Sequence, residues 1–206
     1  MKKLLSTTLL AASFALSGIA HATPLFSTVV FGAGDSTVTL DEVALPDGTV
    51  VTTQFSAWGV TFGPGIRIAA QTFLPEGFSG EYLDNTGELA EAYSVFFNAP
   101  VDAAGAFWEF NENATGTLSA YLNGNLIESF SFLNLECCTA ADFLGFQGII
   151  FNELRLTSSV DTSFILDNIR FSNVDVAAVP EPLSAALFGI GALGIAAARR
   201  RKLRPQ

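Results

Sequence analysis

Basic side chains and histidine are scarce in the central part of this 206-residue chain. The protein has ten lysine and arginine residues and one histidine, but residues 23–178 contain only three arginines and no lysine. Because the same stretch holds 19 acidic residues against those three arginines, its formal charge is −16. So few cations cannot neutralise a phosphate backbone, and we therefore exclude nucleic acid as a partner.

The scarcity of histidine also excludes most kinds of catalysis. His21, the only histidine, lies in an N-terminal segment that we expect to be removed. This rules out histidine general bases, Ser-His-Asp triads and histidine-ligated zinc or copper in the mature protein. Carboxylates are the abundant titratable groups that remain, which leaves hard-cation binding, hydrolysis by paired acids, or a purely solubilising role. We expect a protein that is not an enzyme.

Cysteine is limited to two adjacent residues, Cys137 and Cys138. An oxidising compartment favours disulfides, yet Cα atoms about 3.8 Å apart across a trans peptide lie below the usual disulfide range. A strained vicinal disulfide, two free thiols and intermolecular crosslinks all remain open, and the vicinal disulfide is the pairing that we favour. No Cys-x-x-Cys motif is present, so we do not expect a redox catalyst.

The N-terminus has the pattern of a secretory signal peptide over residues 1–22. Two lysines follow Met1, and an apolar stretch at residues 9–19 comes next. Ala20 and Ala22 then supply small residues at the two positions that signal peptidase reads. We predict cleavage after Ala22, which leaves one domain's length, residues 23–178, as the passenger domain.

The C-terminus, residues 179–206, consists of three consecutive parts. Pro180-Glu181-Pro182 disfavours helix in the preceding residues, so a helix begins only after Pro182. The uncharged residues 183–198 predict a transmembrane helix of about 24 Å, which is shorter than a hydrocarbon core of about 30 Å. Five basic residues then hold that end in the cytoplasm: Arg199, Arg200, Arg201, Lys202 and Arg204.

This arrangement resembles the PEP-CTERM sorting signal. The resemblance implies an exosortase-type membrane protease as a partner, in addition to signal peptidase. It also implies export across the inner membrane of a Gram-negative bacterium, transient anchoring by the C-terminus, and a final place at the cell surface or outside the cell. Proteins with such tails are associated with exopolysaccharide and biofilm matrix, and we expect the same association here.

The passenger domain has an all-β pattern of short apolar and β-branched runs separated by Gly, Pro, Asn and Asp. Asn123-Gly124 predicts a type I′ hairpin turn, and residues 87–93 could form one short helical turn. We predict a two-sheet antiparallel sandwich of jelly-roll type, with a core filled by many of the 19 phenylalanines. The predicted strands are residues 26–31, 37–45, 49–56, 59–62, 66–73, 94–98, 105–111, 117–122, 126–132, 145–151, 153–157 and 163–172.

Three elements resemble those common to PEP-CTERM passengers: residues 47–62, residues 101–132, and residues 143–148 followed by 164–171. Such passengers are similar to jelly rolls of the carbohydrate-binding-module kind, which implies a lectin-like or matrix role. In those jelly rolls, carboxylates near the first strand and in the last strand often hold a structural Ca²⁺. The resemblance places that role on Asp41 or Glu42 together with Asp167, and the oxygen ligands suit Ca²⁺.

A sugar site requires exposed aromatic side chains beside polar groups. Four aromatic residues are candidates, with Glu109, Asn111 and Asn113 close to one of them in sequence. Strand alternation puts Trp108 in the core if Glu109 and Asn111 face outwards, which favours a structural role for Trp108. Glycan binding, ice binding, for which the threonine pattern is poor, and hydrolysis by carboxylates are alternatives to a non-enzymatic matrix role. The four aromatic candidates are Trp58, Tyr82, Trp108 and Tyr121.

Overall fold

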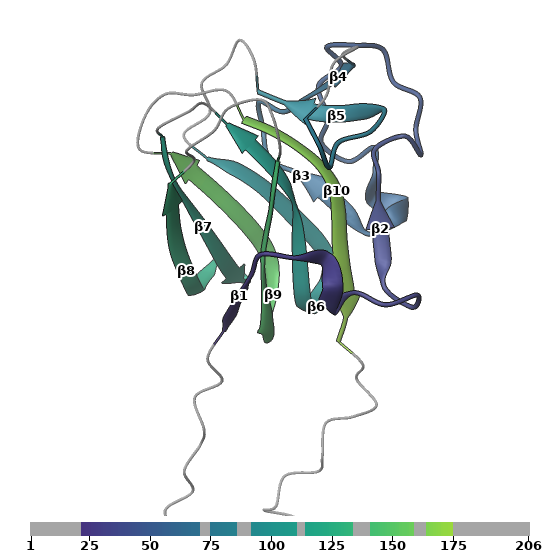
Figure 1. The fold of residues 1–206 in the computed structure, drawn as a ribbon. Helices are drawn as coiled ribbons and strands as arrows, with labels where there is room; N and C mark the ends of the chain where they lie inside the picture. The colour runs from purple at the N-terminus through teal and green to yellow at the C-terminus, as the bar shows by residue number, and fades with distance from the viewer. Residues whose placement is uncertain are drawn as a thin grey trace, which may run out of the picture. The chain divides into compact units, whose positions relative to one another are not determined.

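Antiparallel β-strands make up most of the described chain, which comprises residues 22–70, 75–85, 92–110, 114–133, 141–158 and 164–174 of a computed structural model (Figure 1). Among these residues the only helices are two short 3₁₀ turns, η1 (Thr28–Val30) and η2 (Ser56–Trp58). The prediction of an all-β passenger is thereby confirmed. The strands are β1 (Thr23–Leu25), β2 (Ser36–Val38), β3 (Val60–Phe62), β4 (Arg67–Ala70), β5 (Glu81–Asp84), β6 (Tyr93–Phe110), β7 (Thr115–Leu122), β8 (Asn125–Leu133), β9 (Asp142–Ser158) and β10 (Phe164–Asn173).

The two longest strands, β6 and β9, pair with each other and join two groups of strands. The continuous order is β4-β5-β10-β6-β9-β7-β8, while β1 pairs with β9, β2 with β10 and β3 with β6. The β6–β9 register shifts between Phe96 and Val101. On one side of this shift β6 pairs with β3 and β9 pairs with β7; on the other, β6 pairs with β10 and β9 pairs with β1. The arrangement is consistent with an antiparallel β-sandwich.

Aromatic rings connect the two groups of strands in the core. The ring of Tyr93, at the start of β6, lies 5.8 Å from that of Trp108 near the end of the same strand, and 6.1 Å from Phe164 on β10. The ring of Phe97 similarly lies 5.2 Å from Phe171. All five side chains are buried, and the edge-to-face packing of Tyr93 on Trp108 and Phe164 adds to the stabilisation from burial. The phenylalanine-rich composition therefore serves the core, as the sequence predicted.

The hairpin between β7 and β8 forms at the predicted turn. Asn123 and Gly124 have φ values of 51° and 80°. Positive φ at both central residues is what a two-residue type I′ connection requires, and Asn-Gly tolerates it best. The Asn123 N–H also donates to Asn152 Oδ1 on β9 at 2.9 Å, which ties the turn to the neighbouring strand.

Three predicted strands near the N-terminus are wrong in whole or in part, because side chains take over backbone hydrogen bonds there. Residues 26–31 contain η1, in which Ser27 Oγ accepts from the Val29 N–H. The strand predicted at 37–45 ends at Val38, since Glu42 accepts from the Thr39 N–H at 2.7 Å. Residues 49–56 form a single β-bridge, at Val50, and Gln54 Oε1 accepts from the Thr52 N–H at 2.7 Å before the chain turns into η2. Local capping by polar side chains competes with strand pairing in all three places.

Further along the chain, several predicted strands are present but longer, and two strands of the passenger were missed. Residues 94–98 and 105–111 belong to the continuous strand β6, and residues 145–151 and 153–157 belong to β9. The missed strands are β1, which precedes the first predicted strand, and β5, a four-residue segment with acids at both ends. The predicted helical turn at 87–93 falls on residues outside the described part, apart from residues 92 and 93, and Tyr93 begins β6.

The described residues contain no helix long and apolar enough to cross a membrane. The predicted signal peptide, apart from Ala22, and the predicted transmembrane helix at 183–198 lie outside these residues. Strand β1 begins at Thr23, the first residue after the predicted cleavage site.

Close approach of β6 and β9 requires glycine at a facing pair, Gly105 and Gly145. A Cβ on Gly145 would collide with the Ala104 carbonyl oxygen, and a Cβ on Gly105 would lie 2.9 Å from the Leu144 oxygen. We expect Gly145→Ala to lower the free energy of unfolding by about 1–3 kcal/mol or to prevent folding, because the backbone must shift. Chemical denaturation followed by circular dichroism measures the change. Gly34→Ala is the matched control, since its Cβ would meet nothing within 4 Å; equal stability of the two variants would contradict this account.

Candidate functional site

Several sequence-predicted site residues lie outside the described part of the chain. They are Cys137, Cys138, Asn111, Asn113, Ala20 and the sorting-tail residues Pro180, Glu181, Pro182, Arg199, Arg200, Arg201, Lys202 and Arg204. The predicted disulfide and the predicted cleavage sites stay predictions. The described passenger offers three groups of functional side chains: an acidic cluster, a polar network on β6 and β9, and a pocket beside Trp58.

The acidic cluster brings together residues that are distant in sequence. Asp41 and Glu42 follow β2, Glu81 begins β5 and Asp167 lies on β10. Asp41 Oδ1 accepts from the Glu81 N–H at 2.9 Å. Gly80 has a φ of 68°, and any Cβ there would collide with the Asp41 carboxylate. The sequence alone did not point to Glu81, because an acid at the start of a short strand carries no distinguishing signal.

Asp167 is the most deeply buried member of the cluster, with no exposed surface. Its carboxylate accepts from the N–H groups of Ser79 (2.8 Å) and Asn168 (2.6 Å). Burial raises the pKa of Asp167 to about 7. The two backbone hydrogen bonds lower this pKa, and the nearby carboxylates of Asp41 and Glu42 raise it. Burial, followed by repulsion from Asp41, likewise raises the pKa of Glu81.

The cluster has the donor chemistry of a calcium site, but the carboxylates do not converge. Two buried oxygens, Glu42 Oε2 and Glu81 Oε2, have no hydrogen-bond partner among the described residues. Oxygens of this kind are what Ca²⁺ prefers. Within the described ranges, however, no group of three or more acidic, histidine or cysteine side chains is arranged to hold a metal ion. The Ca²⁺ site predicted on Asp41, Glu42 and Asp167 therefore stays a prediction.

The four aromatic candidates differ sharply in accessibility. Tyr82 and Trp108 are each 1% exposed, and the Trp108 indole N–H donates to the Leu144 carbonyl at 3.3 Å. The structural role expected for Trp108 is confirmed, but Glu109 is also buried instead of facing outwards, on a strand that is central to the sheet. Trp58 is 39% exposed and is the most accessible of the four indole or phenol rings.

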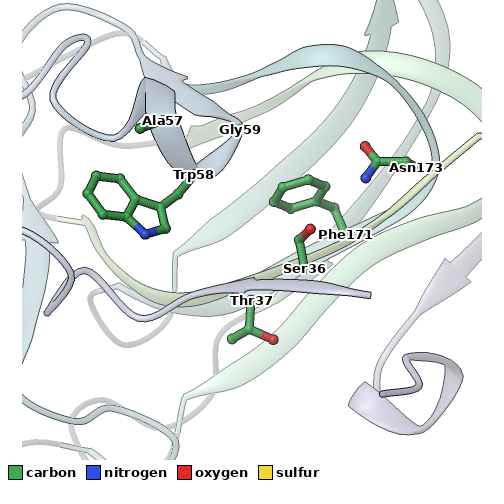
Figure 2. A pocket seen from close by; sticks show the side chains of 7 residues that line it. All are labelled: Ser36, Thr37, Ala57, Trp58, Gly59, Phe171 and Asn173. Carbon is green, nitrogen blue, oxygen red and sulfur yellow. The ribbon is translucent and has the colours of Figure 1, made fainter. Parts of the chain in front are cut away.

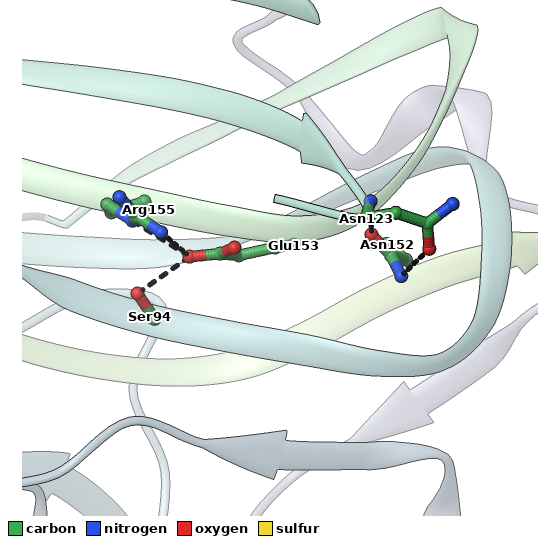
Figure 3. Close-up of polar contacts among 5 residues, drawn as sticks. All are labelled: Ser94, Asn123, Asn152, Glu153 and Arg155. Carbon is green, nitrogen blue, oxygen red and sulfur yellow. Dashed lines mark hydrogen bonds and ion pairs between the residues drawn. The ribbon is translucent and has the colours of Figure 1, made fainter. Parts of the chain in front are cut away.

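A network of polar side chains links the paired strands β6 and β9 (Figure 3). Glu153, 4% exposed, accepts from Ser94 Oγ at 3.0 Å and from Arg155 Nε at 2.8 Å. The Arg155 guanidinium in turn lies 4.2 Å from the centre of the Tyr121 ring. Arg155 therefore covers one face of Tyr121 and neutralises Glu153, so these groups mainly satisfy one another.

A pocket of about 390 Å³ lies beside Trp58 (Figure 2). It is formed by η2 and the glycine after it, by β2, and by the end of β10. In Figure 2, Ser36 and Phe171 lie at its centre, while the side chain of Thr37 points to the opposite side of β2. The lining contains no charged side chain; it consists of Ser36, Thr37, Ala57, Trp58, Gly59, Phe171 and Asn173.

Comparison with known proteins identifies the tail. Residues 178–202 match the PEP-CTERM protein-sorting motif, which confirms the signal predicted at the C-terminus. Such signals are processed by exosortase, a membrane protease, and the motif implies a secreted or surface protein with a transient membrane anchor. No curated protein matches the chain. The match covers none of the described passenger, whose function must be argued from its own residues.

The calcium prediction can be tested by thermal unfolding. If Asp41, Glu42 and Asp167 bind Ca²⁺, a saturating concentration raises the midpoint of unfolding by several degrees, because a ligand of the folded state stabilises it by about 2.7 kcal/mol at a hundredfold excess over Kd. Mg²⁺ and EDTA are the controls, and Asp167→Asn should remove the response. An unchanged midpoint in millimolar Ca²⁺ would rule the site out.

The raised pKa of Asp167 also predicts that the stability of the protein depends on pH in metal-free buffer. Its pKa rises from an ordinary value of 3.8 to about 7 on folding. Between these two values the folded state keeps a proton that the unfolded state has lost, so the contribution of Asp167 to stability falls as the pH rises from about 4 to 7, by at most about 4 kcal/mol. Urea denaturation in EDTA at several pH values measures it. The difference in the free energy of unfolding between wild type and Asp167→Asn should change with pH. A difference that stays constant would contradict the raised pKa.

Proposed function

We propose that this protein is a non-enzymatic component of the cell surface or extracellular matrix, sorted by an exosortase-type protease and associated with exopolysaccharide. The observation that carries the proposal is the PEP-CTERM motif at residues 178–202. Its partners are exosortase and signal peptidase during export, and polysaccharide afterwards. The passenger is assigned to the jelly-roll type, supported by its antiparallel strands and by the two long strands that join both strand groups.

The composition of the tail suits temporary anchoring. Pro180 and Pro182 keep the chain extended next to the membrane, since proline fixes φ and restricts the residue before it. The apolar residues 183–198 span about 24 Å as a helix, so they match a bilayer of about 30 Å poorly. The basic residues 199–204 resist translocation. A helix that is only marginally long enough fits an anchor that is cut after use.

The passenger's side chains support a role in binding or structure more than one in catalysis. The mature chain has no histidine, and residues 23–178 have no lysine to act as a base or nucleophile. Glu153 is held in an ion pair with Arg155 at 2.7 Å. The proposal would fail if the purified protein released reducing ends from the polysaccharide of its source, because that would identify a carboxylate-dependent hydrolase.

Sorting is tested by changing the motif and following the protein through cell fractions. In the double variant Pro180→Ala, Pro182→Ala, we expect the uncleaved precursor to accumulate in the membrane fraction, because the extended segment read by the protease is lost. The wild-type protein should appear at the surface or in the medium as a shorter chain. Immunoblotting with an antibody to the passenger measures both.

Pro205→Ala provides the matched control, since Pro205 lies just outside the matched residues 178–202. This variant should be processed like the wild type. Release of the double variant at the wild-type rate, or persistence of the wild-type precursor in a strain with an active exosortase, would contradict the assignment.

A further inference from the structure

The pocket beside Trp58 combines an open aromatic ring with uncharged polar groups. Trp58 is 39% exposed, whereas the other tryptophan of the chain, Trp108, is 1% exposed. Among the described residues, no group is hydrogen-bonded to the Trp58 indole N–H, to Ser36 Oγ or to the Asn173 amide. Polar groups at a pocket with no protein partner are available to a ligand.

The backbone holds Trp58 firmly at this position. Gly59 ends η2 with a φ of 96°, and a Cβ there would lie 2.8 Å from Phe171 Cζ, so the turn packs directly on the pocket floor. Asn98 donates its side-chain amide to the Ser56 carbonyl at 2.7 Å, and its backbone N–H donates to the Gly59 carbonyl at 2.9 Å. These contacts fix both ends of the turn that carries Trp58, so a ligand would meet an ordered ring.

We propose that this pocket binds one uncharged sugar unit of a polysaccharide, with Trp58 stacking on the C–H face of the ring and with Ser36 and Asn173 bonding its hydroxyl groups. An indole supplies an apolar face, and hydroxyl and amide groups supply the orienting hydrogen bonds that small-ligand sites use. The volume of about 390 Å³ lies within the range of about 300–1,000 Å³ for such sites.

Electrostatics favours a neutral sugar over a uronic acid or a phosphate. The pocket lining has no cation, and the passenger carries a formal charge of −16, from three arginines and 19 acids. An anionic polysaccharide would be repelled by this field. Trp58 is also the better stacking surface, because Arg155 already covers one face of Tyr121. The inference rests on the proposed function for the source of its ligand, the extracellular matrix.

The test measures binding of the full-length protein, in mild detergent, to soluble polysaccharides by affinity electrophoresis. The panel contains neutral polymers, namely a β-glucan, a mannan, a galactan and a xylan, and anionic ones, namely alginate and polygalacturonate. We expect retardation by at least one neutral polymer, at least tenfold weaker binding by Trp58→Ala, and weaker binding by the Ser36→Ala, Asn173→Ala double variant. Thr117→Val is the matched control, since Thr117 lies on β7, which pairs with β8 and β9 and contributes no residue to the pocket lining; it should bind within about twofold of wild type.

Tryptophan fluorescence gives a readout specific to this site. Because Trp108 is buried, acrylamide quenching of the folded protein reports Trp58. Bound polysaccharide should reduce quenching, and Trp58→Ala should show little quenching at all. Melting temperatures of all variants establish that they are folded.

The proposal is overturned if no neutral polymer binds at millimolar sugar concentrations, if only the anionic polymers bind, or if Trp58→Ala binds like the wild type. Sorting is scored separately by fractionation of cells. A Trp58→Ala protein that is still released from the cell but no longer binds supports the proposal. A wild-type protein that binds but is never processed refutes the sorting assignment alone.

Discussion

The ladder between β6 and β9 is the constraint on which the rest of the passenger depends. These strands are 18 and 17 residues long, and both groups of strands hydrogen-bond to them. The register shift after Phe96 divides the ladder into two halves, so that Tyr93 meets Trp108 from the far end of its own strand. Facing glycines, Gly105 and Gly145, permit the close backbone approach. Losing this pairing would divide the sheet between β6 and β9, the two strands that join its halves.

Strand β10 connects the β6–β9 ladder to the two candidate sites. Its register against β6 shifts between Asp167 and Arg170, and Asn168 has a φ of 52° at this irregularity. Asn168 donates its side-chain amide to the Gly77 carbonyl at 2.8 Å, which fastens the loop before β5. Asp167 lies in the acidic cluster on one side of the irregularity. Phe171 lies on the other side, at the floor of the Trp58 pocket (Figure 2). One strand therefore positions a buried carboxylate and an open aromatic pocket.

The function of the tail and the function of the passenger depend on different physical features of the chain. The tail depends on the order of its parts, namely proline, apolar stretch and basic residues, and this order is present in the linear chain. The function of the passenger depends on which side chains remain accessible to solvent after folding. Trp58 and Trp108 are the same residue type, yet one is accessible and the other lies in the core. The composition shows that the passenger is acidic and poor in catalytic groups, but it cannot show which of its aromatic residues are exposed.

The sequence by itself determined the sorting motif, the all-β class and the Asn123-Gly124 hairpin, because each depends on neighbouring residues: proline geometry, strand alternation and positive φ. It also favoured a core position for Trp108, although the alternation on which that prediction depended wrongly turned Glu109 outwards. Local patterns failed where polar side chains capped the backbone, as at Thr39 and Glu42, and where strands continued through a register shift. Only the tertiary structure decided that Glu81 joins Asp41 and that Ser36 and Asn173 share a pocket with Trp58. Ser36 meets Phe171 through the pairing of β2 and β10 across more than a hundred residues of chain, and Asp41 meets Glu81 across 40 residues. Contacts over such distances leave no periodicity in the sequence.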